Sequence, residues 1–224
     1  MINSRNERLL LGINLFIAAG LRMGWPNLTE FKSDEAHLYS LALDMAEGLQ
    51  FPLHGIGSSV GFPNFPLSVW LYAVPTFFWK HPYSATLFTG LLSTLSILGC
   101  WWVVRRYWGV QAALATTFMY AVSPWAVIYS RKIWAQNLLP VFVIGWAASG
   151  MLTFVDGRRR SVAMHVICLA IVLQLHLSGA ALVPITALGL VLYRRKIDWR
   201  WLAAGVVTGV FLGTPLLLHL VSED

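Results

Sequence analysis

The chain has 224 residues, of which 57% are hydrophobic and only 12% are charged, and its formal net charge is +6. Because soluble domains carry about 25% charged residues, this composition excludes an ordinary soluble domain and predicts an all-α polytopic membrane protein. Basic loops on the cytoplasmic side explain the positive charge better than a nucleic-acid partner does. Cys100 and Cys168 both lie in apolar segments, which argues against a disulfide framework or a zinc site.

The first apolar segment covers residues 9–25 and follows a polar, basic stretch. No small-residue cleavage pattern comes after it, so we expect a retained membrane span rather than a signal peptide. A bilayer crossing takes about 20 apolar residues, which places Arg22 at or near the far interface. Further apolar segments that we expect to span the membrane lie at residues 83–104, 110–129, 133–155, 162–175, 179–193 and 201–220.

Residues 67–79 are also apolar, but the segment is short, contains Pro75 and is rich in aromatic residues. Its length fits an interfacial or re-entrant helix better than a span. If it does not cross and the N-terminus is cytoplasmic, eleven of the sixteen Lys and Arg residues lie inside, and the five outside are Arg22, Lys32, Lys80, Arg131 and Lys132. A crossing would exchange these numbers, so the positive-inside rule favours seven spans with residues 67–79 at the outer surface.

This topology predicts one integral-membrane module over residues 1–224. Residues 26–82 would form the first extracytoplasmic loop, which carries juxtamembrane helices, and residues 83–220 the remaining spans. We expect the module in the plasma (inner) membrane, with a cytoplasmic N-terminus and an extracytoplasmic active site.

The loop contains one short amphipathic helix, at residues 31–48, that opens on two adjacent carboxylates. Ser33 is the expected N-cap, and Asp34 and Glu35 fall in the first turn, where the helix dipole favours negative charge. Two interpretations are open at this point. The carboxylates either only stabilise an interfacial helix, or they form a catalytic pair at a membrane surface.

Cations and histidines gather on the same predicted face. Ionisable residues at or inside a membrane are functional candidates by default, although each of these also has a purely structural interpretation as an interfacial or loop residue. The candidates are Arg22, Arg131, Lys132, His37, His54 and His176.

Two stretches resemble a known family. Arg22 lies twelve residues before Asp34-Glu35, and Tyr129-Ser130-Arg131-Lys132 follows the expected third span. Together with the order of apolar segments, this pattern resembles the protein O-mannosyltransferase and aminoarabinose transferase-like glycosyltransferases (glycosyltransferase family 39, PMT_2-like), which have the GT-C fold. The chain departs from the family in two respects: residues 133–137 contain no carboxylate, and full-length members are longer, so we expect an N-terminal membrane module only.

The resemblance implies a GT-C-type bundle and a glycosyltransferase that moves a sugar from a polyprenyl-phosphate donor to a glycan, lipid or protein acceptor outside the cytoplasm. Asp34 would be the general base, and Glu35 would position the acceptor or pair with Arg22. Arg131, Lys132 and Arg22 would bind the donor phosphate, and His37, His54 and His176 would contact substrate. No cofactor is required by the sequence, and a divalent cation held by Asp34 and Glu35 is left open.

Two other functions remain as alternatives. A non-catalytic or truncated module would bind the lipid-linked sugar without turning it over, which the missing later carboxylate favours. A transporter would show repeated halves with helices broken by Gly or Pro, and the sequence shows no such repeat, so this alternative is the weaker one.

Overall fold

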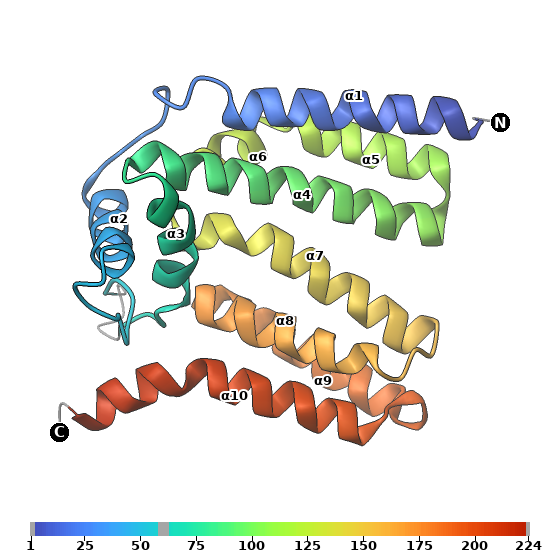
Figure 1. The fold of residues 1–224 in the computed structure, drawn as a ribbon. Coiled ribbons are helices and arrows are strands. Elements are labelled where there is room, and N and C mark those ends of the chain that lie inside the picture. The colour runs from blue at the N-terminus through green and yellow to red at the C-terminus, as the bar shows by residue number, and fades with distance from the viewer. Residues whose placement is uncertain (1–2, 58–62, 223–224) are drawn as a thin grey trace.

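The structure, a computed structural model, describes residues 3–57 and 63–222 (Figure 1). Among these residues it contains no strand, only one isolated bridge between Gly57 and Pro63. The α-helices are α1 (Ser4–Met23), α2 (Ser33–Ala46), α3 (Leu67–Phe78), α4 (Pro82–Trp108), α5 (Val110–Val122), α6 (Pro124–Tyr129), α7 (Leu139–Gly150), α8 (Ser161–Leu175), α9 (Leu182–Leu192) and α10 (Trp199–Ser222). The predicted all-α class is therefore confirmed.

Short turns of other helix types extend several of these elements. A π-helix, η2 (Met151–Val155), continues α7. The 3₁₀-helices are η1 (Ala135–Leu138), η3 (Leu177–Ala181) and η4 (Arg194–Lys196). Together with η1 and η2, α7 fills the apolar segment expected at residues 133–155.

Two local expectations were wrong. The segment 110–129 is not one helix but breaks between α5 and α6, because Pro124 has no amide hydrogen to donate and disfavours a helical Ser123. The N-cap of α2 is Lys32 rather than Ser33, and the Glu35 carboxylate accepts a hydrogen bond from the Lys32 amide, which is one half of a capping box.

Three helical stretches are long and apolar enough to cross a membrane: Pro82–Trp108, Ala135–Val155 and Trp199–Val221. Four shorter apolar stretches accompany them, at Leu67–Phe78, Val110–Val122, Ser161–Leu175 and Leu177–Leu192. The first of these, α3, has 12 residues and so a length of about 18 Å, short of the roughly 30 Å hydrocarbon core. The total of seven spans stays a prediction.

The long helices run side by side between two ends of the bundle (Figure 1). At one end, α1 finishes, α4 begins, and α2 and α3 lie across the helix ends; we call it the α2 end. The opposite end carries the start of α1 and the α4–α5, α7–α8 and α9–α10 connections, which hold the clustered arginines; we call it the basic end.

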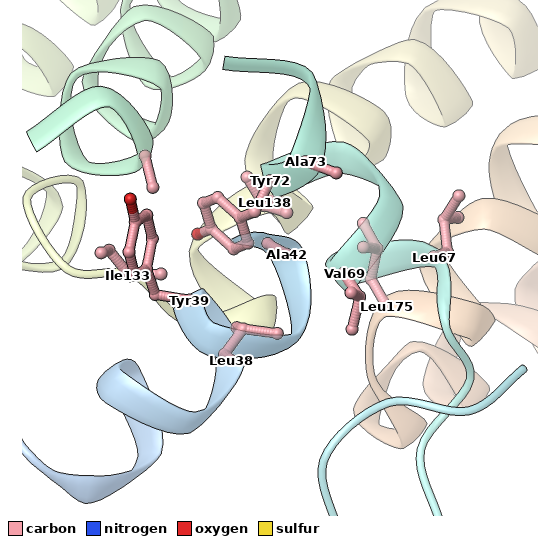
Figure 2. Close-up of a cluster of buried hydrophobic side chains, with 11 residues drawn as sticks. Leu38, Tyr39, Ala42, Leu67, Val69, Tyr72, Ala73, Ile133, Leu138 and Leu175 are labelled. Atoms are coloured by element: carbon pink, nitrogen blue, oxygen red, sulfur yellow. The ribbon is translucent and has the colours of Figure 1, made fainter. Parts of the chain in front are cut away.

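A buried hydrophobic cluster at the α2 end joins α2 to α3 and to the η1 region (Figure 2). Its centre is Tyr72, which is fully buried. The Tyr72 hydroxyl donates to the Trp134 carbonyl at 3.0 Å, accepts from the Trp134 amide at 3.1 Å and lies 3.1 Å from Thr89 Oγ1. One side chain thereby ties α3 to α4 and to the strand-like segment before η1.

Tyr39 lies in the same cluster and supplies a natural contrast (Figure 2). Its hydroxyl is also buried but has no hydrogen-bond partner among the described residues. Apolar packing thus accounts for what Tyr39 contributes, whereas Tyr72 contributes both packing and hydrogen bonds.

We expect Tyr72→Phe to lower the free energy of unfolding by roughly 2 kcal/mol, because it strands the Trp134 amide and carbonyl without a partner. Tyr39→Phe is the matched control and should be neutral or slightly stabilising, since it removes an unpartnered polar atom. Thermal unfolding of both variants in detergent checks the pair, and equal losses would contradict the hydrogen-bond assignment.

Candidate functional site

A polar cavity of about 210 Å³ opens at the α2 end. It is built from the start of α2, the segment around residue 56, the start of α3, η1 and the end of α8, and we call it the Asp34 cavity. The described residues that line it are Asp34, Ile56, Gly57, Asn64, Ser68, Trp134, Ala135, Gln136, Leu175 and His176. Residues from four other parts of the chain therefore meet Asp34 in this cavity.

Asp34 is the acidic residue in the lining of this cavity, and its carboxylate makes no hydrogen bond or ion pair with the described residues. The residue is exposed, and no hydrogen bond or ion pair holds it within residues 3–57 and 63–222. Its place in the first turn of α2 puts the carboxylate near the positive end of the helix dipole. The carboxylate is thus available to a ligand.

Glu35 has the opposite environment, although it is the next residue. It is 4% exposed, its Oε2 accepts from the Lys32 amide at 3.1 Å, and its Oε1 lies 3.4 Å from Lys132 Nζ. The expected pairing with Arg22 does not form, and Lys132 takes that place. The acidic pair is therefore divided into one structural and one accessible carboxylate.

Lys132 sits between two carboxylates beside the cavity wall. Its Nζ contacts Glu30 and Glu35 and lies 5.2 Å from the ring centroid of Trp134, which lines the Asp34 cavity. Hydrogen bonding to Glu30 is the largest cause that raises the pKa of Lys132. Hydrogen bonds from Lys132 and then Lys32 lower the pKa of Glu30 to about 2.

Arg131 holds the end of α1. Its Nη1 donates to the Leu21 carbonyl at 3.0 Å, and its Nη2 donates to the carbonyls of Gly24 and Trp25. Leu21 lies in the last turn of α1, where carbonyls have no intrahelical partner, and Gly24 and Trp25 follow directly after the helix. The buried Nε of Arg131 has no partner among the residues that the structure describes.

Arg22 likewise donates hydrogen bonds to carbonyls at the end of α5. The side chain is 1% exposed, and its guanidinium donates to the Tyr120 carbonyl at 2.8 Å and the Ala121 carbonyl at 2.7 Å. Its Nε also donates to Ser93 Oγ at 3.0 Å. Arg22 is therefore buried between the helices at the last turn of α1, and it does not line the Asp34 cavity.

A second cavity, of about 170 Å³, lies beside Arg22 and is called the bundle cavity here. Ser93 and Tyr120 line it and both contact Arg22. Gln136 belongs to the lining of this cavity and of the Asp34 cavity. A neutral amide from η1 thus contributes to both spaces.

The three candidate histidines lie in three different environments. His176 lines the Asp34 cavity, where its Nδ1 is bonded to Ser178. His54 lies outside that cavity and its ring is 4.3 Å from that of His219 on α10, in a third cavity of about 190 Å³. His37 is exposed on α2 and makes no hydrogen bond within the described ranges.

The structure therefore brings Asp34 and His176 together and leaves His37 and His54 elsewhere. Sequence reasoning missed the neutral polar members of the lining, Asn64, Ser68 and Gln136. Amide and hydroxyl side chains are uncharged, so a search of the sequence for charged residues does not find them. The one available cue was the position of Gln136 in the loop after the Ser-Arg pair, where residues 133–137 lack a carboxylate.

The acidic pair does not fit a divalent cation. In the described parts of the chain, no three His, Cys, Asp or Glu side chains come together as a metal-binding group. Glu35 is already bound to Lys132 and to the Lys32 amide, so Asp34 has no second carboxylate beside it. We assign no step to a cation.

No protein-family model matches the chain. No curated protein matches it either. Among solved structures, the chain is similar to the crystal structure of ArnT from Cupriavidus metallidurans bound to undecaprenyl phosphate, with a TM-score of 0.65 and 18% identity. The match covers 97% of this chain and 41% of the ArnT chain. This likeness supports the predicted GT-C fold, and the chain spans well under half the length of that protein.

We expect Arg22→Met to lower the free energy of unfolding by roughly 3 kcal/mol, because it leaves the buried carbonyls at the end of α5 without donors. Arg8→Met on the same helix removes an equal charge from an exposed position and should change stability by less than about 0.5 kcal/mol. Unfolding in detergent measures both, and similar losses would show that charge rather than capping is responsible.

Acid should weaken the contact between Glu30 and Lys132. The pKa of Glu30 is lowered from 4.5 to about 2, so its stabilising contribution is complete above about pH 4.5 and is lost as the pH falls toward about 2. Wild type and Glu30→Gln should therefore differ by a constant amount in thermal midpoint between about pH 5 and pH 8, and converge below that range. A difference that persists at pH 2 would contradict the assignment.

Proposed function

We propose that the chain is an integral-membrane glycosyltransferase module, which moves a sugar from a polyprenyl-phosphate donor to an acceptor hydroxyl at the α2 end. The observation that carries this proposal is the Asp34 cavity. It combines an accessible, unengaged carboxylate with neutral hydrogen-bonding groups, at an end of the bundle where a lipid-linked donor would present its phosphate.

The comparison supports the class of donor. ArnT, whose fold the chain shares, was crystallised with undecaprenyl phosphate. A polyprenyl chain would lie in the bilayer beside the apolar helices, and its phosphate would reach the end of the bundle. The sequence resemblance to aminoarabinose transferase-like enzymes leads to the same donor class by a separate route.

In the proposed reaction, Asp34 accepts the proton of the acceptor hydroxyl. The hydroxyl oxygen forms a bond to the anomeric carbon, and the bond from that carbon to the phosphate oxygen breaks with its electron pair on the phosphate. Attack from the face opposite the phosphate implies inversion at the anomeric carbon. A positioned general base of this kind contributes roughly 10²- to 10⁴-fold to a rate.

Lys132 is the cation that we propose for the departing phosphate. Its Nζ lies beside the cavity wall and is held by Glu30 and Glu35. An incoming phosphate would take the place of Glu30, the exposed partner, while the buried Glu35 keeps the ammonium in position. Arg131 and Arg22 are engaged by helix carbonyls, so we give them a positioning role.

Gln136 and His176 complete the proposed site as groups that orient the acceptor. Both line the cavity, and the His176 Nδ1 is held by Ser178, which leaves the other ring nitrogen for a ligand. An amide and an imidazole can each donate to or accept from sugar hydroxyls.

We expect Asp34→Asn to reduce transfer from a radiolabelled polyprenyl-phosphate sugar by roughly 10²- to 10⁴-fold, with donor binding retained. The matched control is Asp44→Asn on the same helix, where the carboxylate is outside the cavity and bonded to Gln50. The measurement is turnover in nanodiscs together with saturation binding of the donor.

Normal turnover by Asp34→Asn would remove Asp34 from the mechanism. Saturable donor binding without turnover in the wild type would instead favour a binding module. Equal losses in the Asp34 and Asp44 variants would indicate damage to α2 rather than to the chemistry.

A further inference from the structure

A separate apolar groove of about 370 Å³ lies toward the basic end, between α7, η2, α8 and α9. Its walls include Trp146, Phe154, Ile185, Leu188, Leu192 and Tyr193. None of the residues that line it belongs to the Asp34 cavity or the bundle cavity. The glycosyltransferase chemistry proposed above makes no use of this groove.

The polar side chains in the body of the groove, His165 and Trp146, already have hydrogen-bond partners. His165 Nδ1 lies 2.8 Å from the Trp146 carbonyl, and its Nε2 lies 3.2 Å from Thr186 Oγ1. The Trp146 indole donates to the same Thr186 oxygen at 2.9 Å. A sugar or nucleotide would have to bury its polar groups there without partners, so the groove suits a hydrocarbon chain.

The mouth of the groove is strongly basic. Tyr193 lines the groove and is followed directly by Arg194, Arg195 and Lys196. Lys196 Nζ donates to the Phe154 carbonyl at 2.8 Å, which joins this segment to the end of η2. Gly157 lies next to the Lys196 side chain, because a Cβ placed on it would be 4.0 Å from that side chain. The three arginines at residues 158–160 therefore follow directly after a residue that adjoins this basic segment.

The nearby acids do not cancel this charge. The Asp156 carboxylate accepts from Arg106 Nη2 at 2.7 Å and from the Tyr107 hydroxyl at 3.1 Å, so it is committed to α4. Asp198 accepts from the Arg200 amide at 3.1 Å. Arg194 and Arg195 are exposed, and no hydrogen bond or ion pair of their side chains occurs among the described residues.

We propose that this groove and its mouth form a binding site for an anionic phospholipid. One acyl chain lies in the groove, and the phosphate lies against Arg194 and Arg195 with the Tyr193 hydroxyl as a further donor. The occupant follows from the combination of an apolar channel, in which His165 and Trp146 already have partners, and an adjoining uncompensated positive cluster. Basic pockets between membrane helices are suited to anionic lipid headgroups.

The proposal differs from a general attraction between cations and an anionic membrane surface. Arg5 and Arg8 lie at the same end of the bundle, at the start of α1, and are exposed as well. They do not adjoin the groove. A general surface attraction would depend on both arginine pairs equally, whereas a site would depend on Arg194 and Arg195.

The test uses the full chain in detergent, freed of bound lipid, with binding measured by native mass spectrometry and thermal stabilisation. Phosphatidylglycerol should bind at least about tenfold more tightly than phosphatidylcholine, and glycerol 3-phosphate, which lacks acyl chains, should not stabilise the protein. The double variant Arg194→Gln/Arg195→Gln should lose about tenfold or more in affinity for phosphatidylglycerol.

The double variant Arg5→Gln/Arg8→Gln is the matched control and should keep its affinity within about twofold. Ala147→Phe, which fills the groove without changing charge, should weaken binding of the same lipid. Three outcomes overturn the proposal: equal losses in both arginine pairs, equal binding of phosphatidylcholine, or self-association of lipid-free chain that places a second copy over the groove.

Discussion

Two arginines each donate hydrogen bonds to carbonyls at the end of another helix, and the geometry of the α2 end depends on this reciprocal pair of contacts. Arg22, from the last turn of α1, donates to the carbonyls that end α5, while Arg131, which follows α6, donates to the carbonyls that end α1. A guanidinium offers five donors in a fixed plane and a charge opposite to the helix C-terminal dipole. The Arg22 contact with Ala121 is buried, where an unpaired carbonyl is costly. The two sets of contacts fix α1, α5 and the following loop relative to one another.

That loop carries Lys132, Trp134 and Gln136, so the two arginine contacts also position the groups around Asp34. The two neighbouring carboxylates of α2 then have different roles. Glu35 is buried against Lys132 and holds the loop to the helix, whereas Asp34 remains exposed to the cavity. Adjacent residues on a helix point about 100° apart, which is enough to separate a structural group from an accessible one.

Much of the fold could be predicted from the sequence, because apolar runs of sufficient length and a helical stripe mark each helix with local information. The short helix α3 was expected from its length and Pro75. The break before Pro124 was not expected, because the apolar run continues through this proline and conceals the helix boundary. The site was less accessible. A sequence shows that Arg22 and Arg131 are charged near helix ends, but the carbonyls that they bind lie about a hundred residues away along the chain.

The contribution of Gln136 to two cavities has a consequence for selectivity. The Asp34 cavity and the bundle cavity share this side chain, so a rotation about its χ angles alters the capacity of both without moving a helix. Side-chain rotations are far faster than helix movements. A residue of another size at position 136 would therefore change the volume of both cavities at once, while the helices around them stay in place.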